Sequence, residues 1–234
     1  MTAEDIRKRL RDLENKEKAK ILQGFFKTGP GEYGEGDLFL GIPVPRLRRV
    51  SKECDAMAIG ETEALLKSAV HEERLLALLI LIRKYNGEDE SGKKGIYSFY
   101  LKNMRRINNW DLVDLSAPNV VGDYLLNRSR KPLYDLARSS ALWERRVAIV
   151  ATIRFIREGQ FEDTLGISEI LLRDKEDLIQ KAVGWMLREV GKRDSSVEET
   201  FLQKHYTQMP RTMLRYAIER FLASKREGYM KGRI

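Results

Sequence analysis

The chain has 234 residues, of which 42% are hydrophobic, and its 43 Lys and Arg against 35 Asp and Glu give a net charge of +8. This composition is typical of a folded globular chain, and the basic excess favours a polyanionic partner or an anionic membrane surface. One cysteine excludes an internal disulfide framework, and no apolar run approaches the roughly 20 residues that span a bilayer. The charged N-terminus is not a secretory signal, so we expect a cytoplasmic protein with no membrane partner.

Helical patterns dominate the chain from end to end. Thr2 with Asp5 fits a helix start, and Ser196 with Glu199 predicts a capping box at a later one. The glycine-rich segment 28–37 lacks the signature of a phosphate-binding loop and is predicted to join two helices. Apolar residues recur at helical spacing in four segments: 72–85, 143–156, 176–190 and 211–223.

These four segments align with one another and indicate an internal repeat. An alanine falls in register at Ala77, Ala148, Ala182 and Ala217, with gaps of 71, 34 and 35 residues. A unit of about 35 residues holds two short helices, as in stacked helical-repeat proteins. We therefore predict an all-α superhelix of HEAT-like repeats forming a single domain over residues 1–234. Chance alignment of amphipathic helices is the alternative.

An arginine follows the alanine by six residues in three of the copies. These are Arg83, Arg154 and Arg188, and we call them the basic seam, because second helices line the concave side of such arrays. Lys181, Trp185 and Arg188 share one helix face by their spacing. In the alternative interpretation, Trp185 fills the core and its flanking cations form a solvated edge.

The segment NNWDLVDLSAPNVVGDYL, residues 108–125, places acids beside an indole. Asn108 or Asn109 can cap the helix, and Asp111 in the first turn suits the positive end of its dipole. Asp114 lies four residues after Trp110, hence on the same face, where a desolvated carboxylate needs a cation. That cation is either a ligand or a neighbouring side chain such as Arg146.

Other chemistry has little support in the sequence. His71 and His205 are isolated along the chain, with no carboxylate or cysteine at metal-ligand spacing, so we expect neither a metal nor another cofactor. Two histidines and one cysteine in unrelated contexts do not form a nucleophilic triad.

Four motifs together resemble the DNA alkylation repair family of HEAT-like-repeat DNA glycosylases. They are GEGDLFLGIPVPRLRRVSKE, NNWDLVDLSAPNVVGDYL, WERRVAIV and IQKAVGWMLREVGK, in that order along the chain. The resemblance extends from about residue 20 to 225. It implies a monomeric, metal-free enzyme that binds duplex DNA and excises positively charged N3- and N7-alkylated purines without a deep pocket for a flipped base.

The resemblance also implies roles for individual residues. By motif position, Asp114, Trp110 and Trp185 match the catalytic residues that face the lesion, and Arg146 matches an arginine that contacts DNA. Arg188 is a second expected phosphate contact, with Lys181, Arg154 and Arg83 as further DNA-binding candidates. Phe25, also a DNA-binding candidate, replaces the tyrosine of an active relative, which keeps the ring but removes its hydroxyl.

The chemistry suits these residue types. An alkylated purine is already cationic and leaves without a general acid, while Asp114 can stabilise the positive charge that develops on the sugar. The indoles of Trp110 and Trp185 favour cations. Two alternatives remain open: a non-catalytic module that binds branched or damaged DNA, and a scaffold for an acidic protein partner.

Overall fold

The computed structural model describes residues 1–234, and helices form its only regular secondary structure. One isolated parallel bridge joins Leu38 to Val70. No helix combines the length and the apolar character that crossing a membrane requires. The chain divides into two compact units, Met1–Ser116 and Ala117–Ile234, here called the N-terminal and C-terminal units. The predicted all-α class is confirmed, whereas the single domain and its concave groove stay predictions.

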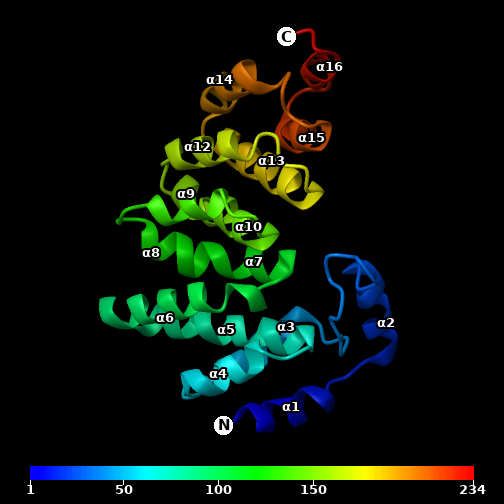
Figure 1. Cartoon of the computed structure of the whole chain (residues 1–234), viewed down its shortest axis with the longest axis vertical. Coiled ribbons are helices and arrows are strands. Elements are labelled where there is room, and N and C mark those ends of the chain that lie inside the picture. Colours follow the sequence, from blue (N-terminus) through cyan, green and yellow to red (C-terminus); the bar gives the residue numbers. More distant parts are fainter. The chain divides into compact units, whose positions relative to one another are not determined.

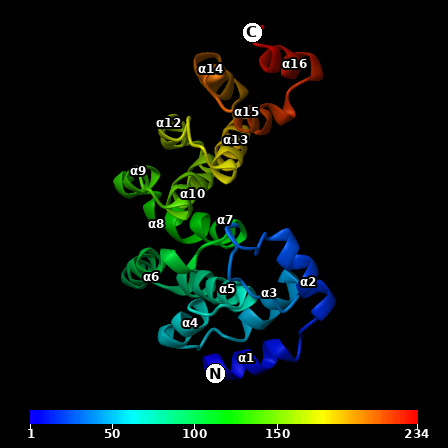
Figure 2. The ribbon, with the colours of Figure 1, turned by 45° about the vertical axis from the view of Figure 1, so that its right-hand side comes forward.

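The N-terminal unit is built around one long buried helix, α5, against which α3, α4 and α6 pack (Figure 1). Figure 2 shows the same neighbours from a second direction. Its helices are α1 (Ala3–Arg11), α2 (Lys16–Phe25), α3 (Val44–Lys52), α4 (Ile59–Leu66), α5 (His71–Gly87), α6 (Glu90–Lys102), the short η1 (Met104–Arg106) and α7 (Trp110–Ala117). The last helix ends at the first residue of the C-terminal unit.

The C-terminal unit is a succession of helical hairpins in which α13 contacts α10, α12, α14 and α15. Its helices are η2 (Pro118–Gly122), α8 (Asp123–Leu125), α9 (Lys131–Ala137), α10 (Leu142–Ala151), α11 (Ile153–Arg157), α12 (Glu162–Ile170), α13 (Asp177–Gly191), α14 (Ser195–His205), α15 (Arg211–Ala217), η3 (Ile218–Arg220) and α16 (Ala223–Lys231). The predicted helical segments therefore correspond to α5, to α10 with α11, to α13 and to α15 with η3.

The four aligned alanines lie on packed faces. Ala77, Ala148, Ala182 and Ala217 are all fully buried. A small side chain lets neighbouring helices approach closely, and Gly184 on α13 shows how close: a Cβ there would lie 2.3 Å from the carbonyl oxygen of Met213 on α15. The predicted repeat therefore follows the positions at which consecutive helices pack.

One predicted cap is confirmed and one is wrong. The Thr2 hydroxyl accepts from the Asp5 amide while the Asp5 carboxylate accepts from the Thr2 amide, which completes a capping box. At α14, however, Asp194 is the capping residue and accepts from the amides of Ser196 and Val197. A carboxylate competes well for these donors because it also interacts with the helix dipole.

The glycine-rich segment is a loop, as predicted, and the loop is fixed to the start of α5. The Leu38 amide donates to the Ala69 carbonyl at 3.0 Å, and the His71 amide donates to the Leu38 carbonyl at 2.8 Å. Gly41 follows with φ of +76°, and a Cβ at this position would lie 2.2 Å from the carbonyl oxygen of Asn15. Only glycine accommodates both the backbone conformation and this approach.

The buried carboxylate of Glu72 completes the attachment of the loop. It accepts hydrogen bonds from the amides of Leu40, Gly41 and Ile42 at 2.8–3.2 Å. We expect Glu72→Gln to lower the free energy of unfolding by about 2 kcal/mol, because hydrogen bonds to a charged acceptor are the stronger kind and the amide offers one oxygen in place of two. Urea denaturation measures this loss. Glu14→Gln, at an exposed position, should change stability by less than about 0.5 kcal/mol.

Candidate functional site

Helix α7 presents Trp110 and Asp114 from consecutive turns of one face. The helix begins at Trp110, whose amide donates to the Asn109 side-chain oxygen at 2.8 Å. Asn109 is fully buried, so this start of the helix is held from within the unit. Trp110 and Asp114 are both half-buried. Their spacing of four residues brings an indole and a carboxylate together at a partly open surface.

Aromatic rings support the Trp110 indole from behind. Phe26 is stacked on it with ring centroids 5.2 Å apart, and Phe25 meets it edge-on at 6.0 Å. Phe26 stacks in turn on Phe39 at 5.0 Å. Phe25 is 61% exposed, whereas Phe26 is buried. Phe25, a predicted DNA-binding residue, therefore lies beside Trp110. Nothing in the sequence indicated Phe26, which contacts the face of the indole.

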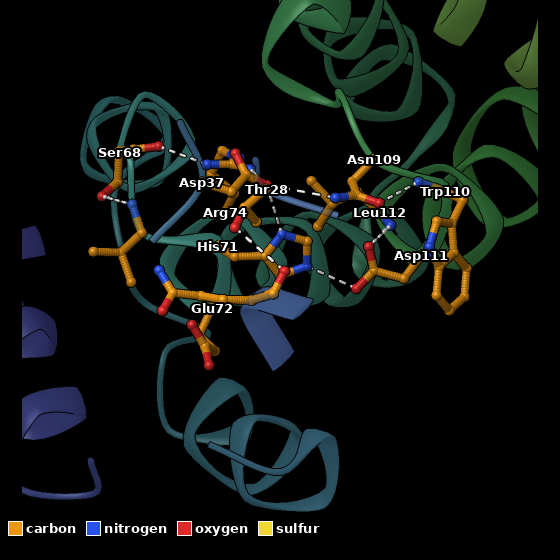
Figure 3. Close-up of polar contacts among 12 residues, drawn as sticks. Thr28, Asp37, Ser68, His71, Glu72, Arg74, Asn109, Trp110, Asp111 and Leu112 are labelled. Atoms are coloured by element: carbon orange, nitrogen blue, oxygen red, sulfur yellow. Dashed lines mark hydrogen bonds and ion pairs between the residues drawn. The ribbon is translucent and has the colours of Figure 1, made fainter. Parts of the chain in front are cut away.

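Beneath these rings lies a buried ionic cluster centred on His71 (Figure 3). The His71 Nδ1 lies 3.1 Å from a carboxylate oxygen of Asp37, and Nε2 lies 2.8 Å from one of Asp111. Arg74 donates to the same Asp37 oxygen at 2.6 Å. The expectation that His71 is isolated is wrong, because its partners lie 34 and 40 residues away along the chain.

The geometry of this cluster requires a charged imidazole. A neutral imidazole donates at one nitrogen only, whereas both nitrogens of His71 face carboxylate oxygens, so the imidazolium satisfies both. Burial opposes this charge, but the hydrogen bonds that His71 donates to Asp111 and Asp37 outweigh it and raise the pKa of His71. Burial likewise opposes the charge of Asp37, yet His71 and Arg74 lower the pKa of Asp37. We call Asp37, His71, Arg74 and Asp111 the ionic cluster.

Asp111 has two structural roles. One is at the start of α7, as its position in the first turn predicted, and the other is in the ionic cluster. Its second oxygen accepts from the Leu112 amide at 2.9 Å, while the first accepts from His71. Asp111, the carboxylate next to Trp110 in the sequence, therefore belongs to the ionic cluster. Asp114 is the carboxylate of α7 on the indole's own face.

The surroundings of Asp114 include the buried phenol of Tyr100. Burial is the main cause that raises the Tyr100 pKa, the hydrogen bond to Ser116 opposes it, and the negative charge of Asp114 raises it further. The Tyr100 hydroxyl and the Ser116 hydroxyl are 2.9 Å apart. The buried Tyr100 phenol therefore lies close enough to Asp114 to sense its negative charge.

A cavity of about 410 Å³ opens beside the cluster between α2 and the start of α3. Its walls are largely apolar, and the polar groups at its lining include His71, Glu72 and Asp111. Ile21 and Val44 at its rim are exposed together with Phe25. This face of the N-terminal unit therefore combines apolar contact area with the half-exposed indole.

Three further candidates of the expected site lie on α13 in the C-terminal unit. Trp185 on α13 is half-buried rather than part of the core, and its indole nitrogen donates to Glu189 at 3.1 Å. Lys181 pairs with Asp177 at 2.6 Å, and Arg188 pairs with Glu219. The predicted stripe of Lys181, Trp185 and Arg188 thus lies along a partly open face of α13.

The other predicted DNA contacts are held in local interactions. Arg83 forms a bidentate pair with the exposed Asp55, and Arg154 pairs with Asp123 and Glu158. Arg146 is buried and donates to the Leu178 carbonyl. Exposed ion pairs exchange readily with other charges, so Arg83 and Arg154 can still meet a polyanion. The convergence of these residues with Trp110 and Asp114 stays a prediction.

The second histidine is not isolated either, since His205 Nε2 lies 3.0 Å from Glu169. No group of three or more His, Cys, Asp or Glu side chains is arranged to hold a metal ion. The members of the ionic cluster come from three separate segments of the N-terminal half, GEGD, HEER and NNWD. Nothing in their spacing signals that they meet.

The sequence and the all-α fold match known proteins of one class. The family profile of the DNA alkylation repair enzymes matches residues 6–221. A solved structure described as a predicted DNA alkylation repair enzyme from Enterococcus faecalis has the same fold, with a TM-score of 0.70 and 18% identity over 90% of this chain and 97% of that chain. No curated protein matches the sequence significantly.

Because the family profile covers nearly the whole chain, the protein belongs to the DNA alkylation repair enzyme family. Its role is in DNA alkylation repair, and DNA is its substrate. The resemblance found in the sequence motifs is thereby confirmed.

Proposed function

We propose that the protein is a monofunctional DNA glycosylase that removes positively charged N3- and N7-alkylated purines from duplex DNA. The observation that carries this proposal is the pairing of the half-buried Trp110 and Asp114 on one face of α7. An indole face and a carboxylate both favour a cation, at roughly 0.5 to 2 kcal/mol for the indole contact. Substrate and transition state are both cationic in this reaction.

In the proposed reaction the bond between the purine N9 and the sugar C1′ breaks, and its electron pair neutralises the purinium ring. The leaving base is therefore neutral and needs no proton donor. Positive charge passes to the sugar, where the Asp114 carboxylate stabilises it. Water then adds to C1′ and releases one proton, leaving an abasic site. A carboxylate interacts more strongly with such a cation at a half-buried position than in bulk water.

The surrounding residues support this division of roles. Phe26 holds the indole of Trp110 at a fixed orientation, and the ionic cluster fixes the start of α7 through Asp111. Preorganised charge of this kind requires little rearrangement as the reaction proceeds. Trp185 and Arg146 of the C-terminal unit are proposed as the second indole and as a DNA contact.

Base release from defined duplexes tests the proposal. We expect release of 7-methylguanine from a duplex carrying one such lesion, at a rate well above that of the duplex alone. A matched duplex carrying the neutral lesion 1,N6-ethenoadenine should release nothing, because its base is a poor leaving group without an acid. Release of the neutral lesion would contradict the mechanism. Tight binding of branched DNA without any base release would instead support a non-catalytic DNA-binding protein.

A further inference from the structure

A second pocket, with a polar lining, lies in the N-terminal unit where the turn before α5 meets the turn before α7. Its volume is about 250 Å³, and polar atoms dominate its lining. Four cationic side chains contribute to it, and they are Lys67, Arg74, Arg105 and Arg106. None of these was a candidate in the sequence analysis. We call this the arginine pocket.

The two arginines of η1 are the unneutralised charges of the arginine pocket. Arg105 and Arg106 are both exposed, and neither side chain forms an ion pair or a hydrogen bond within the chain. Arg83, Arg154 and Arg188 of the basic seam, by contrast, each face a carboxylate. A polyanion that approaches Arg105 and Arg106 therefore displaces no internal partner.

The acidic residues at the pocket are already engaged. Asp37 is held by Arg74 and His71, and the exposed Glu35 accepts a hydrogen bond from the Gly31 amide at 2.8 Å. Lys67 is paired with Glu63 at 2.9 Å. Arg74 therefore neutralises Asp37, and Glu63 neutralises Lys67. The charges that remain are those of Arg105, Arg106 and Glu35, so the pocket has a net positive charge.

Two buried polar atoms at the same place lack partners. The Nε of Arg74, a residue only 3% exposed, donates to nothing, and Oδ1 of Asn108 accepts nothing. A buried donor without an acceptor is unfavourable, and an incoming anionic oxygen would satisfy it. Rotation of the Asn108 amide by 180° exchanges its oxygen for a second donor. Both residues line the arginine pocket.

We infer that the arginine pocket binds a phosphate group of the DNA backbone. The inference rests on DNA being the substrate in the proposed function, but it does not require catalysis. Arginine presents several donors in a planar fork that matches phosphate oxygens. Arg106 lies four residues before Trp110, and the pocket shares Asp37 and Arg74 with the ionic cluster. A phosphate bound here holds one DNA strand at a fixed distance from the indole.

The salt dependence of DNA binding tests this site directly. The double variant Arg105→Gln/Arg106→Gln should lower affinity for an undamaged duplex, and the slope of log Kobs against log[salt] should fall in magnitude by about 1, the value for one lost phosphate contact. Arg105→Lys/Arg106→Lys should retain most of the parent's salt slope, because both positive charges are kept. Both positions are exposed, so the variants should melt at the parent temperature.

A matched control removes the same charge elsewhere on the unit. Lys8 and Arg11 of α1 are exposed, and Lys8→Gln/Arg11→Gln should leave the slope unchanged. An unchanged slope in the Arg105/Arg106 variant, or an equal change in the control, would overturn the inference. Because binding alone is measured, the result stands whether or not base release is observed.

Titration with inorganic phosphate separates the DNA backbone from a small free anion. We expect weak amide shifts at Ser68 and around Asn108 in NMR spectra, lost in the double glutamine variant. Tight phosphate binding combined with an unchanged DNA slope would show a receptor for a free anion and would contradict the assignment to DNA.

Discussion

Asp114→Asn is expected to reduce single-turnover release of 7-methylguanine by about 10²–10³-fold, the range for loss of one preorganised charge-stabilising group. Asparagine preserves the shape of the side chain and its place on α7 but removes the charge that opposes the cationic sugar. Because the effect is on the transition state, affinity for the lesion duplex should change far less than the rate. Quenched-flow or manual sampling with excess protein measures the rate, and fluorescence anisotropy measures the affinity.

The control for this variant is Asp12→Asn, which removes an exposed carboxylate at the end of α1 and leaves net charge equal in the two proteins. It should release base at the parent rate. A parent-like rate in Asp114→Asn would eliminate the proposed mechanism. A loss that followed affinity rather than rate would show that Asp114 acts in binding.

His71→Gln should lower the free energy of unfolding by about 3 kcal/mol, as expected when one partner of a buried ionic network is removed. Glutamine cannot donate to Asp37 and Asp111 as a cation does, so the Asp111 carboxylate, 18% exposed, loses its partner. The ring contacts of His71 with Phe26 and Phe39 are also lost. In urea denaturation the midpoint should fall by about 1 M.

His205→Gln is the matched control, because the His205 ring also packs against a phenylalanine and contacts a carboxylate. His205 is buried, but its partner Glu169 is 45% exposed, so solvent screens this pair more than it screens the ionic cluster. A solvent-screened pair contributes about 0–1 kcal/mol, so this variant should lose less stability than His71→Gln. Equal losses in the two variants would show that the ionic cluster is no stronger than a solvent-screened pair.

The stabilisation by His71 should depend on pH with a definite sign. Its pKa is raised in the folded protein, so its contribution is fully present below the ordinary value of 6.5 and is lost as pH rises through the higher folded pKa. Asp37 has a lowered pKa, so its contribution is present above 3.8 and is lost as pH falls through the folded pKa. The difference between parent and His71→Gln should therefore shrink at alkaline pH.

Unfolding curves from pH 5 to 9 and an NMR titration of the His71 ring check this dependence. A ring that titrates below 6.5, together with a difference in stability that is constant across this range, would contradict the charged state of His71. The indole of Trp110 is a second probe of this pH dependence, because the ionic cluster fixes the start of its helix through Asp111.

The proposed site joins a reactive face to a rigid support within the N-terminal unit. Trp110 and Asp114 are half-buried on α7, while Asp111 of the same helix belongs to the ionic cluster. Asp37 and Arg74 then connect that cluster to the arginine pocket. A phosphate contact and the lesion contact would thus be positioned by the same few buried residues, which explains the use of charged groups in a place where apolar packing alone would suffice for stability.

The amino-acid sequence by itself determined the helices, the packed alanine faces and the one-turn spacing of Trp110 and Asp114. These features follow from local backbone geometry, in which residues three or four apart share a face. The repeated alanines were informative for the same reason, since each copy packs its own neighbour. Motif resemblance added the family, which the profile match confirms.

Only the tertiary structure decided which charges are neutralised and which remain available. His71 looked isolated because Asp37 and Asp111 lie 34 and 40 residues from it, and the loop that carries Asp37 reaches α5 through the Leu38–Val70 bridge. The arginines predicted by the repeat form ion pairs with carboxylates, whereas the side chains of Arg105 and Arg106, in a short turn, form none. Pairing between distant segments depends on how loops close and helices pack, and the hydrophobic periodicity of the sequence does not indicate which segments meet.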